Sequence, residues 1–69
     1  MRARLTKVQM QMLLDGKPIT NGRVKFALPE GDSETRRVLQ SMVSNEALRK
    51  QYAIFLDMSD LSIVVEEYK

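Results

Sequence analysis

The chain has 69 residues, with 11 basic and 9 acidic side chains and neither cysteine nor histidine. A chain of this length forms one domain, expected over residues 1–69, and buries only about 60% of the surface that its unfolded state exposes. The absent residue types exclude disulfides, thiolate or imidazole metal sites, and the bases and nucleophiles most common near neutral pH. We therefore expect a non-enzymatic protein that needs no cofactor or metal and gains stability from a second subunit.

The N-terminal residues 1–6 are charged and precede no apolar segment of the signal-peptide type. No apolar run has the length of a membrane span. The absence of cysteine is typical of a reducing compartment. We expect a cytoplasmic protein without a membrane partner.

Charge is unevenly distributed along the chain. Residues 1–28 carry six basic side chains and one acidic side chain, whereas residues 29–69 carry five basic and eight acidic side chains. The sequence therefore joins a basic N-terminal segment to a mildly acidic remainder.

Residues 4–28 are predicted to form a long antiparallel β-hairpin. Apolar and polar side chains alternate over residues 7–12 and 23–28, which is typical of half-buried strands. Leu5 and Leu13 do not fit this alternation. The hairpin would bring six apolar side chains to one face: Val8, Met10, Met12, Val24, Phe26 and Leu28.

Two positions for the hairpin turn fit the sequence, because Asp15-Gly16 and Asn21-Gly22 both favour positive φ. One register pairs Leu14 with Gly22 around a seven-residue loop. The other turns tightly at Asp15-Gly16 and needs a bulge before residue 23. The sequence alone does not separate the two registers.

A helix is predicted over residues 33–43, with Asp32 or Ser33 as its N-cap. Ser44 can cap a second, short helix over residues 45–52. Four apolar residues recur at helical spacing in the first of these helices and define one stripe: Val38, Leu39, Met42 and Val43.

Residues 53–56 fit either the end of the second helix or a short buried strand. Residues 57–60 predict a turn, and residues 61–68 predict the last strand, with Leu61, Ile63 and Val65 on one face. The elements run β-β-α-(α)-β. This order indicates an α+β fold, in which the N-terminal β-hairpin and the C-terminal strand form a small antiparallel sheet covered on one face by one or two helices.

Two kinds of binding fit such a fold. We expect a small interaction module, a homodimer that binds or regulates a protein partner, because a free sheet edge and methionine-rich surface both favour association. The alternative is a nucleic-acid-binding accessory protein, whose basic hairpin would neutralise phosphates. Arg36-Arg37 and Arg49-Lys50 on the helices are other basic sites that could do so. In both cases the candidate binding surface is the polar face of the hairpin and its margin: Gln9, Gln11, Arg23, Lys25, Arg4 and Lys7.

Two pairs of neighbouring carboxylates are the remaining candidates for chemistry. Asp57 and Asp60 are typical turn formers, and Glu66 and Glu67 would point to opposite faces of a strand. We interpret both pairs as structural.

Overall fold

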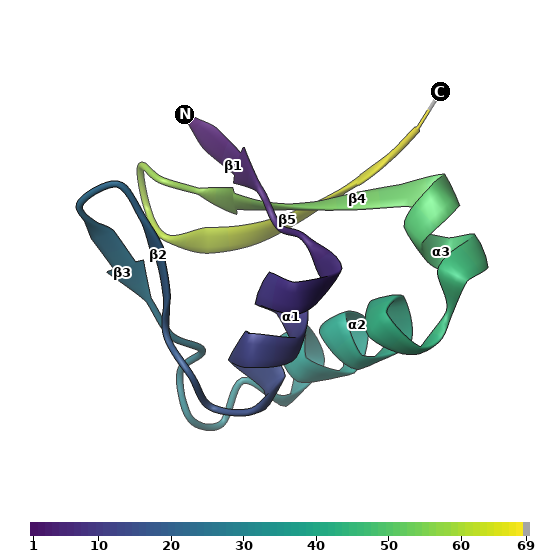
Figure 1. Cartoon of the computed structure of the whole chain (residues 1–69), viewed down its shortest axis with the longest axis horizontal. Helices are drawn as coiled ribbons and strands as arrows, with labels where there is room; N and C mark the ends of the chain where they lie inside the picture. Colours follow the sequence, from purple (N-terminus) through teal and green to yellow (C-terminus); the bar gives the residue numbers. More distant parts are fainter. Residues whose placement is uncertain (69) are drawn as a thin grey trace.

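The structure is a computed structural model that describes residues 1–68 (Figure 1). Its elements are, in chain order, β1 (Arg2–Arg4), α1 (Lys7–Leu14), β2 (Ile19–Asn21), β3 (Val24–Phe26), α2 (Ser33–Ser44), α3 (Glu46–Gln51), β4 (Tyr52–Asp57) and β5 (Ser62–Glu67).

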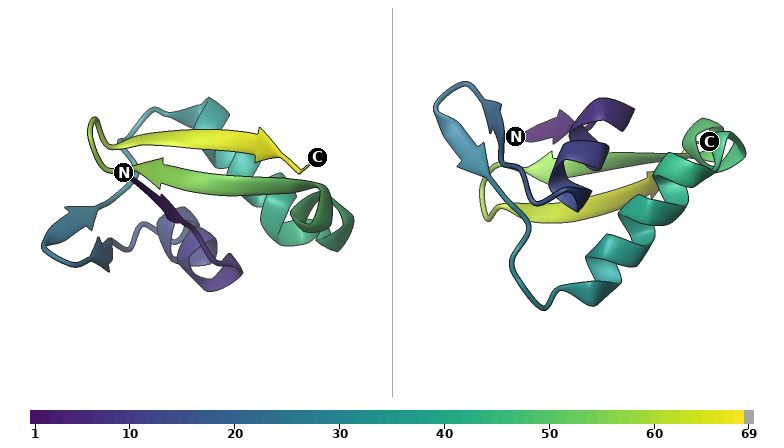
Figure 2. Two further views of the ribbon diagram at one scale, coloured as in Figure 1. Left: turned by 90° about the horizontal axis from the view of Figure 1, so that it is seen from above. Right: turned by 60° about the horizontal axis from the view of Figure 1, so that its bottom comes forward.

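The predicted fold class is confirmed, because the chain is α+β, with a small antiparallel sheet and helices packed on one face of it (Figure 1). The membership of that sheet differs from the expectation. Its strands are ordered β1-β4-β5, whereas β2 and β3 form a separate two-stranded sheet at its side (Figure 2).

The prediction of a strand over residues 7–14 is wrong, because this segment is helix α1. Thr6 and Gln9 form a capping box: the N–H of Gln9 donates to Thr6 Oγ1 (3.1 Å), and the N–H of Thr6 donates to Gln9 Oε1 (2.9 Å). The alternating methionines and glutamines suit a helix, since both are good helix formers. Met10 and Leu13 lie one turn apart and are buried, so Leu13 fits the helical period and not the strand period.

Helix α1 ends at Asp15-Gly16 in a Schellman motif. Gly16 has a φ of 79°, and its N–H donates to the carbonyl of Leu13 (3.1 Å). The N–H of Lys17 donates to the carbonyl of Met12 (2.9 Å). Glycine suits this position because a Cβ disfavours positive φ. One of the two dipeptides predicted to form a hairpin turn is therefore a helix cap.

The other dipeptide, Asn21-Gly22, lies at the turn of a short hairpin. Asn21 pairs with Val24 and Ile19 pairs with Phe26, which leaves a loop of two residues. Gly22 has a φ of 62°, as the first loop residue of a type II′ turn requires. Both registers predicted for a long hairpin are therefore wrong, and Ile19 and Phe26 bury their side chains in the core.

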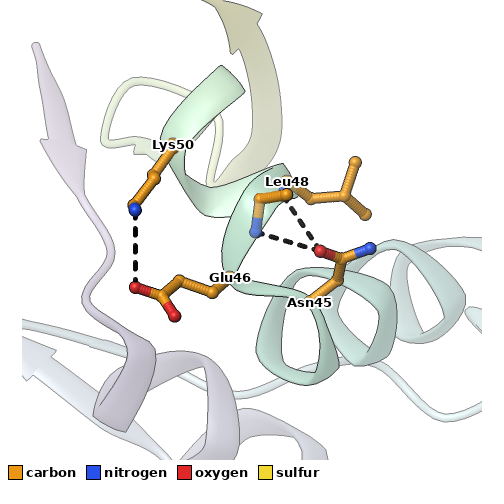
Figure 3. A network of polar contacts seen from close by, with 5 residues as sticks. Asn45, Glu46, Leu48 and Lys50 are labelled. Carbon is orange, nitrogen blue, oxygen red and sulfur yellow. Dashed lines mark hydrogen bonds and ion pairs between the residues drawn. The ribbon is translucent and has the colours of Figure 1, made fainter.

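Helices α2 and α3 agree with the two helices predicted from the sequence. The Asp32 carboxylate accepts a hydrogen bond from the first turn of α2 and caps it. Asn45 caps α3 in place of Ser44: its Oδ1 accepts from the N–H groups of Ala47 (3.0 Å) and Leu48 (3.4 Å) (Figure 3).

Residues 53–56 belong to the strand β4, which is the centre of the three-stranded sheet. Leu56 lies opposite Ala3 of β1 on one side and Ile63 of β5 on the other. Ile54 and Leu56 point to the inner face and are fully buried beneath the sheet. The core combines side chains of both sheets, of α1 and α2, and of the β1–α1 connection: Leu5, Met10, Leu13, Ile19, Phe26, Leu39, Met42, Ile54 and Leu56.

The turn between β4 and β5 is closed by Asp57. Its Oδ1 accepts from the hydroxyl (2.6 Å) and the N–H (2.9 Å) of Ser59. These two bonds favour the charged carboxylate, and with the positive N-terminus and Arg2 they hold the pKa of Asp57 below its ordinary value. The predicted turn over residues 57–60 is thus confirmed.

Replacing Thr6 tests whether a capping box stabilises α1. We expect Thr6→Ala to lower the free energy of unfolding by about 1 kcal/mol, because the N–H of Gln9 loses its acceptor. Thr6→Asp is the matched control and should retain wild-type stability, since aspartate also caps helices. Urea unfolding followed by circular dichroism measures both variants. Equal stability of the alanine and aspartate variants would contradict the role of the cap.

The lowered pKa of Asp57 predicts a specific loss of stability in acid. Because its folded-state pKa lies below its unfolded-state pKa, Asp57 stabilises the fold above the unfolded-state value, and this contribution disappears as the pH falls through the folded-state value. Below about pH 4, the wild type should lose stability more steeply than Asp57→Asn, which keeps an oxygen acceptor but does not titrate. Thermal unfolding across this pH range compares them, and parallel curves would contradict the assignment.

Candidate functional site

Strand β5 is a free edge of the sheet. It pairs with β4, and no other strand of residues 1–68 lies along its outer side (Figure 2). The N–H of Tyr68 donates to the carbonyl of Gln51 (2.9 Å). In an antiparallel pair every second residue directs its backbone groups to the partner strand, so the even-numbered residues of β5 face β4. The N–H and C=O groups of Ile63, Val65 and Glu67 therefore point to the free edge.

The two edges of the sheet differ in length and charge. β1 has three residues, two of them arginine, whereas β5 has six residues and contains no lysine, arginine or proline. Short strands, positive charges and prolines are devices by which natural proteins prevent pairing at an edge. β5 ends in two glutamates but is apolar from Ile63 to Val65. It therefore retains an edge that another strand can extend.

Apolar side chains remain exposed along β5. Val65 is 46% exposed, and Leu61, which directly precedes the strand, is 43% exposed. Leu61 also has a φ of 56°, a left-handed conformation that costs about 1–2 kcal/mol for a residue with a Cβ. A strained and exposed leucine at the start of the free edge points to a role outside the folding of the monomer.

A shallow apolar groove lies on the inner side of the sheet, close to the free edge. Its volume is about 250 Å³, and it exposes mainly apolar atoms. Tyr52 lines the groove and lies opposite Glu67, so the groove extends toward β5. The lining residues come from α2, α3 and β4: Arg37, Val38, Ser41, Met42, Leu48 and Tyr52.

The outer face of the three-stranded sheet is open, since the helices pack on the inner face (Figure 1). Arg2 and Glu66 form an ion pair that links β1 to β5. The guanidinium of Arg4 lies 5.4 Å from the centre of the Tyr68 ring, within the range of a cation–π interaction. Phe55 of β4 lies opposite Arg4. This open face therefore combines two aromatic rings with charges that are already partnered.

The six residues predicted to form one binding surface lie in three regions. Gln9 and Gln11 are on α1, where Gln9 closes the capping box and Gln11 donates to Asp15 (3.0 Å). Arg23 and Lys25 are on the hairpin of β2 and β3. A common polar hairpin face does not exist, because α1 replaces one of its two strands.

Arg4 and Lys7, the other two predicted residues, line one cleft. The cleft has a volume of about 450 Å³ and lies between the β1–α1 connection, the end of α2 and the junction of α3 with β4. Arg49 of α3 also lines it, although the sequence indicates this residue only as part of a separate basic pair with Lys50. No local signal connects Arg49 with Arg4 and Lys7, since only the fold places α3 across the cleft from the β1–α1 connection.

Three of the four neighbouring carboxylates have structural partners. Asp57 accepts two hydrogen bonds from Ser59, and Asp60 accepts two from Ser62. Glu66 is paired with Arg2. Within the described part of the chain, no three His, Cys, Asp or Glu side chains are grouped so that they could hold a metal ion.

Comparison with models of protein families, with curated proteins and with solved structures finds no match to this chain. Among residues 1–68, no helix is long and apolar enough to cross a membrane. Function is therefore inferred from the geometry of the chain itself.

Proposed function

We propose that this chain is a non-enzymatic interaction module that forms a homodimer through β5 and binds a protein partner as a dimer. The observation that carries the proposal is the free edge of β5. Its backbone groups at Ile63, Val65 and Glu67 point away from β4, and its side chains Leu61 and Val65 are exposed. Strand addition satisfies such backbone groups and covers the adjacent apolar side chains.

A second copy fits this edge because the strand is self-complementary. A twofold axis perpendicular to the sheet pairs two β5 strands antiparallel and keeps both inner faces on the same side. With Val64 on the axis, Ile63 lies opposite Val65 of the second copy, and these aliphatic side chains pack in pairs. Like-charge repulsion disfavours the register that places Glu66 opposite Glu66 of the second copy.

The groove beside β5 supplies the further surface that a dimer needs. Stable interfaces bury about 1,200–2,000 Å² in total, more than the backbone of one short edge strand provides. In the antiparallel arrangement, the inward-facing apolar side chains of the second copy lie beside the inner side of the first copy's sheet. The apolar groove at Val38, Leu48 and Tyr52 is the surface that we assign to receive them.

The open face of the sheet is the surface that we assign to a protein partner. Dimerisation joins two three-stranded sheets and doubles the area of this face. Phe55 and Tyr68 provide aromatic contacts on it, and aromatic residues are enriched at the centres of protein interfaces. Affinity capture with the wild type and with Tyr68→Glu, after nuclease treatment, tests the assignment. A protein retained by the wild type and lost with the variant supports it, whereas equal retention contradicts it.

Nucleic-acid binding through the N-terminal segment has less support as an alternative. The basic side chains that were expected on one hairpin face are divided between the cleft, with Arg4 and Lys7, and the short hairpin, with Arg23 and Lys25. A salt titration of DNA and RNA binding tests this alternative, because release of counterions predicts a steep loss of affinity with salt.

A lysine at the exposed edge should prevent dimer formation. We expect Val65→Lys to weaken self-association by about tenfold or more, since a charge at the centre of the paired strands is left without a partner. Val8→Lys is the matched control, because Val8 is 68% exposed on α1, away from β5. Sedimentation equilibrium measures both variants. Equal effects of the two lysines, or a wild type that is monomeric at all concentrations, would contradict the proposal.

Replacing Leu61 should change the stability of the monomer and of the dimer in opposite directions. Leu61→Asn relieves the left-handed strain, because asparagine tolerates this conformation, and should stabilise the monomer by up to about 1 kcal/mol. The same change removes an exposed apolar side chain from the edge and should weaken the dimer. Unfolding measured in a Val65→Lys background isolates the monomer, and sedimentation of the single variant reports the dimer. An unchanged or tighter dimer would contradict a contact of Leu61 across the interface.

A further inference from the structure

We propose that the cleft lined by Arg4, Lys7 and Arg49 binds a small organic phosphate, with the phosphate at its basic rim and the apolar part of the ligand against its floor. The cleft adjoins the groove that we assign to the dimer, because Met42 and Tyr52 line both, but its three basic residues lie outside that groove. The cleft borders β1, and β1 and β5 are opposite edges of the three-stranded sheet. Either proposal can therefore fail while the other holds.

The cleft has the size and composition of a small-molecule site. Its volume of about 450 Å³ lies within the range of ligand pockets. Arg4, Lys7 and Arg49 come from three separate elements, and no Asp or Glu belongs to its lining. The lining therefore carries a concentrated positive charge in a protein whose net charge is only +2.

The ion pairs of the described residues leave this charge unneutralised. The two ion pairs found there join Arg2 to Glu66 and Lys50 to Glu46, so they use none of the three basic residues of the cleft. Glu46 is paired with Lys50 of its own helix at 3.7 Å (Figure 3). An anion bound in the cleft would meet Lys7 and Arg49, with Arg4, whose guanidinium also contacts the Tyr68 ring, at the margin, and no carboxylate in the lining.

Arg49 is held in position by the end of α2. Its Nη1 donates to the carbonyls of Met42 and Val43, both at 2.8 Å, and the side chain is partly buried. These bonds restrict its movement before any ligand binds. A guanidinium has five N–H donors, so further donors remain for a phosphate oxygen. A fixed guanidinium binds phosphate with a smaller loss of side-chain entropy.

The first turn of α1 adds uncapped backbone donors at the same rim. The capping box satisfies the N–H groups of Thr6 and Gln9, and Met10 N–H donates to the carbonyl of Thr6 (2.9 Å). The N–H groups of Lys7 and Val8 are among the helix-initial donors that have no intrahelical acceptor. Thr6 and Lys7 belong to the cleft lining, so the positive end of the helix dipole lies beside the three cations.

The floor of the cleft indicates a ligand that is more than a bare anion. Buried apolar side chains form it, from the β1–α1 connection, α1, α2 and β4: Leu5, Met10, Met42 and Ile54. Contact with such a floor favours an apolar or aromatic group on the ligand. Three cations with backbone donors match the charge of a phosphate dianion better than that of a single carboxylate.

Titration of the protein with phenyl phosphate, followed by ¹H–¹⁵N NMR, tests the proposal. We expect saturable shifts for the backbone amides around Lys7 and Ala53, with the Arg49 side-chain signal also shifting. Inorganic phosphate and benzoate should each bind more weakly than phenyl phosphate, because each lacks one part of the ligand. Binding should persist in Val65→Lys, because the cleft does not include β5.

Matched charge removal identifies the site. Arg4→Gln with Lys7→Gln should weaken binding of phenyl phosphate by about tenfold or more, whereas Arg23→Gln with Lys25→Gln should change it by less than about twofold. Both double variants lose the same charge, and neither replaces a core residue. Equal losses in the two variants, an absence of saturable shifts, or benzoate binding as tightly as phenyl phosphate would overturn the proposal. The proposal would also be overturned if a single-stranded oligonucleotide bound more tightly than phenyl phosphate and lost the same affinity in both double variants.

Discussion

Strand β4 pairs on both sides, and the rest of the molecule depends on this pairing. Backbone groups of its even-numbered residues face β1, as the bond from Leu5 N–H to the carbonyl of Ile54 shows, and those of its odd-numbered residues face β5. The side chains of Ile54 and Leu56 can then be buried on the inner face against α1 and α2. With β4 in the centre, β1 and β5 become the two edges, and each edge borders one of the candidate sites.

The two edges have opposite properties. β1 is short and bears arginines, which disfavour strand addition, and the chain turns directly from it into α1 to form one wall of the basic cleft. β5 is longer and apolar in its middle, and an exposed, strained Leu61 precedes it. A single topology thus places the edge that we propose for a second copy of the chain on one side and the cleft that we propose for a small anion on the other.

The sequence predicts the C-terminal half of this fold better than the N-terminal half. The apolar stripe of α2 and its cap at Asp32 fit only a helix. The alternation over β5 fits only a strand. The segment 7–14 has two, because Met and Gln alternate at a strand period while Met10 and Leu13 also satisfy the helical one. The spacing from Thr6 to Gln9 is a capping-box signature and could have decided in favour of the helix.

The candidate sites depend on information that local patterns do not contain. An exposed edge was expected, but its assignment to β5 follows from the position of β4 between two strands. Arg49 joins Arg4 and Lys7 only because the fold places α3 across one cleft from the β1–α1 connection. Periodicity predicts which face of an element is buried. It does not predict which elements become neighbours.

Hydrogen exchange of single amides in β5 tests the central claim most directly. The N–H of Val64 bonds within the monomer, whereas those of Ile63 and Val65 point to the free edge. If β5 pairs with a second copy, protection of Ile63 and Val65 should rise with protein concentration while that of Val64 changes little. Fast exchange of Ile63 and Val65 at all concentrations, with Val64 protected throughout, would contradict the claim.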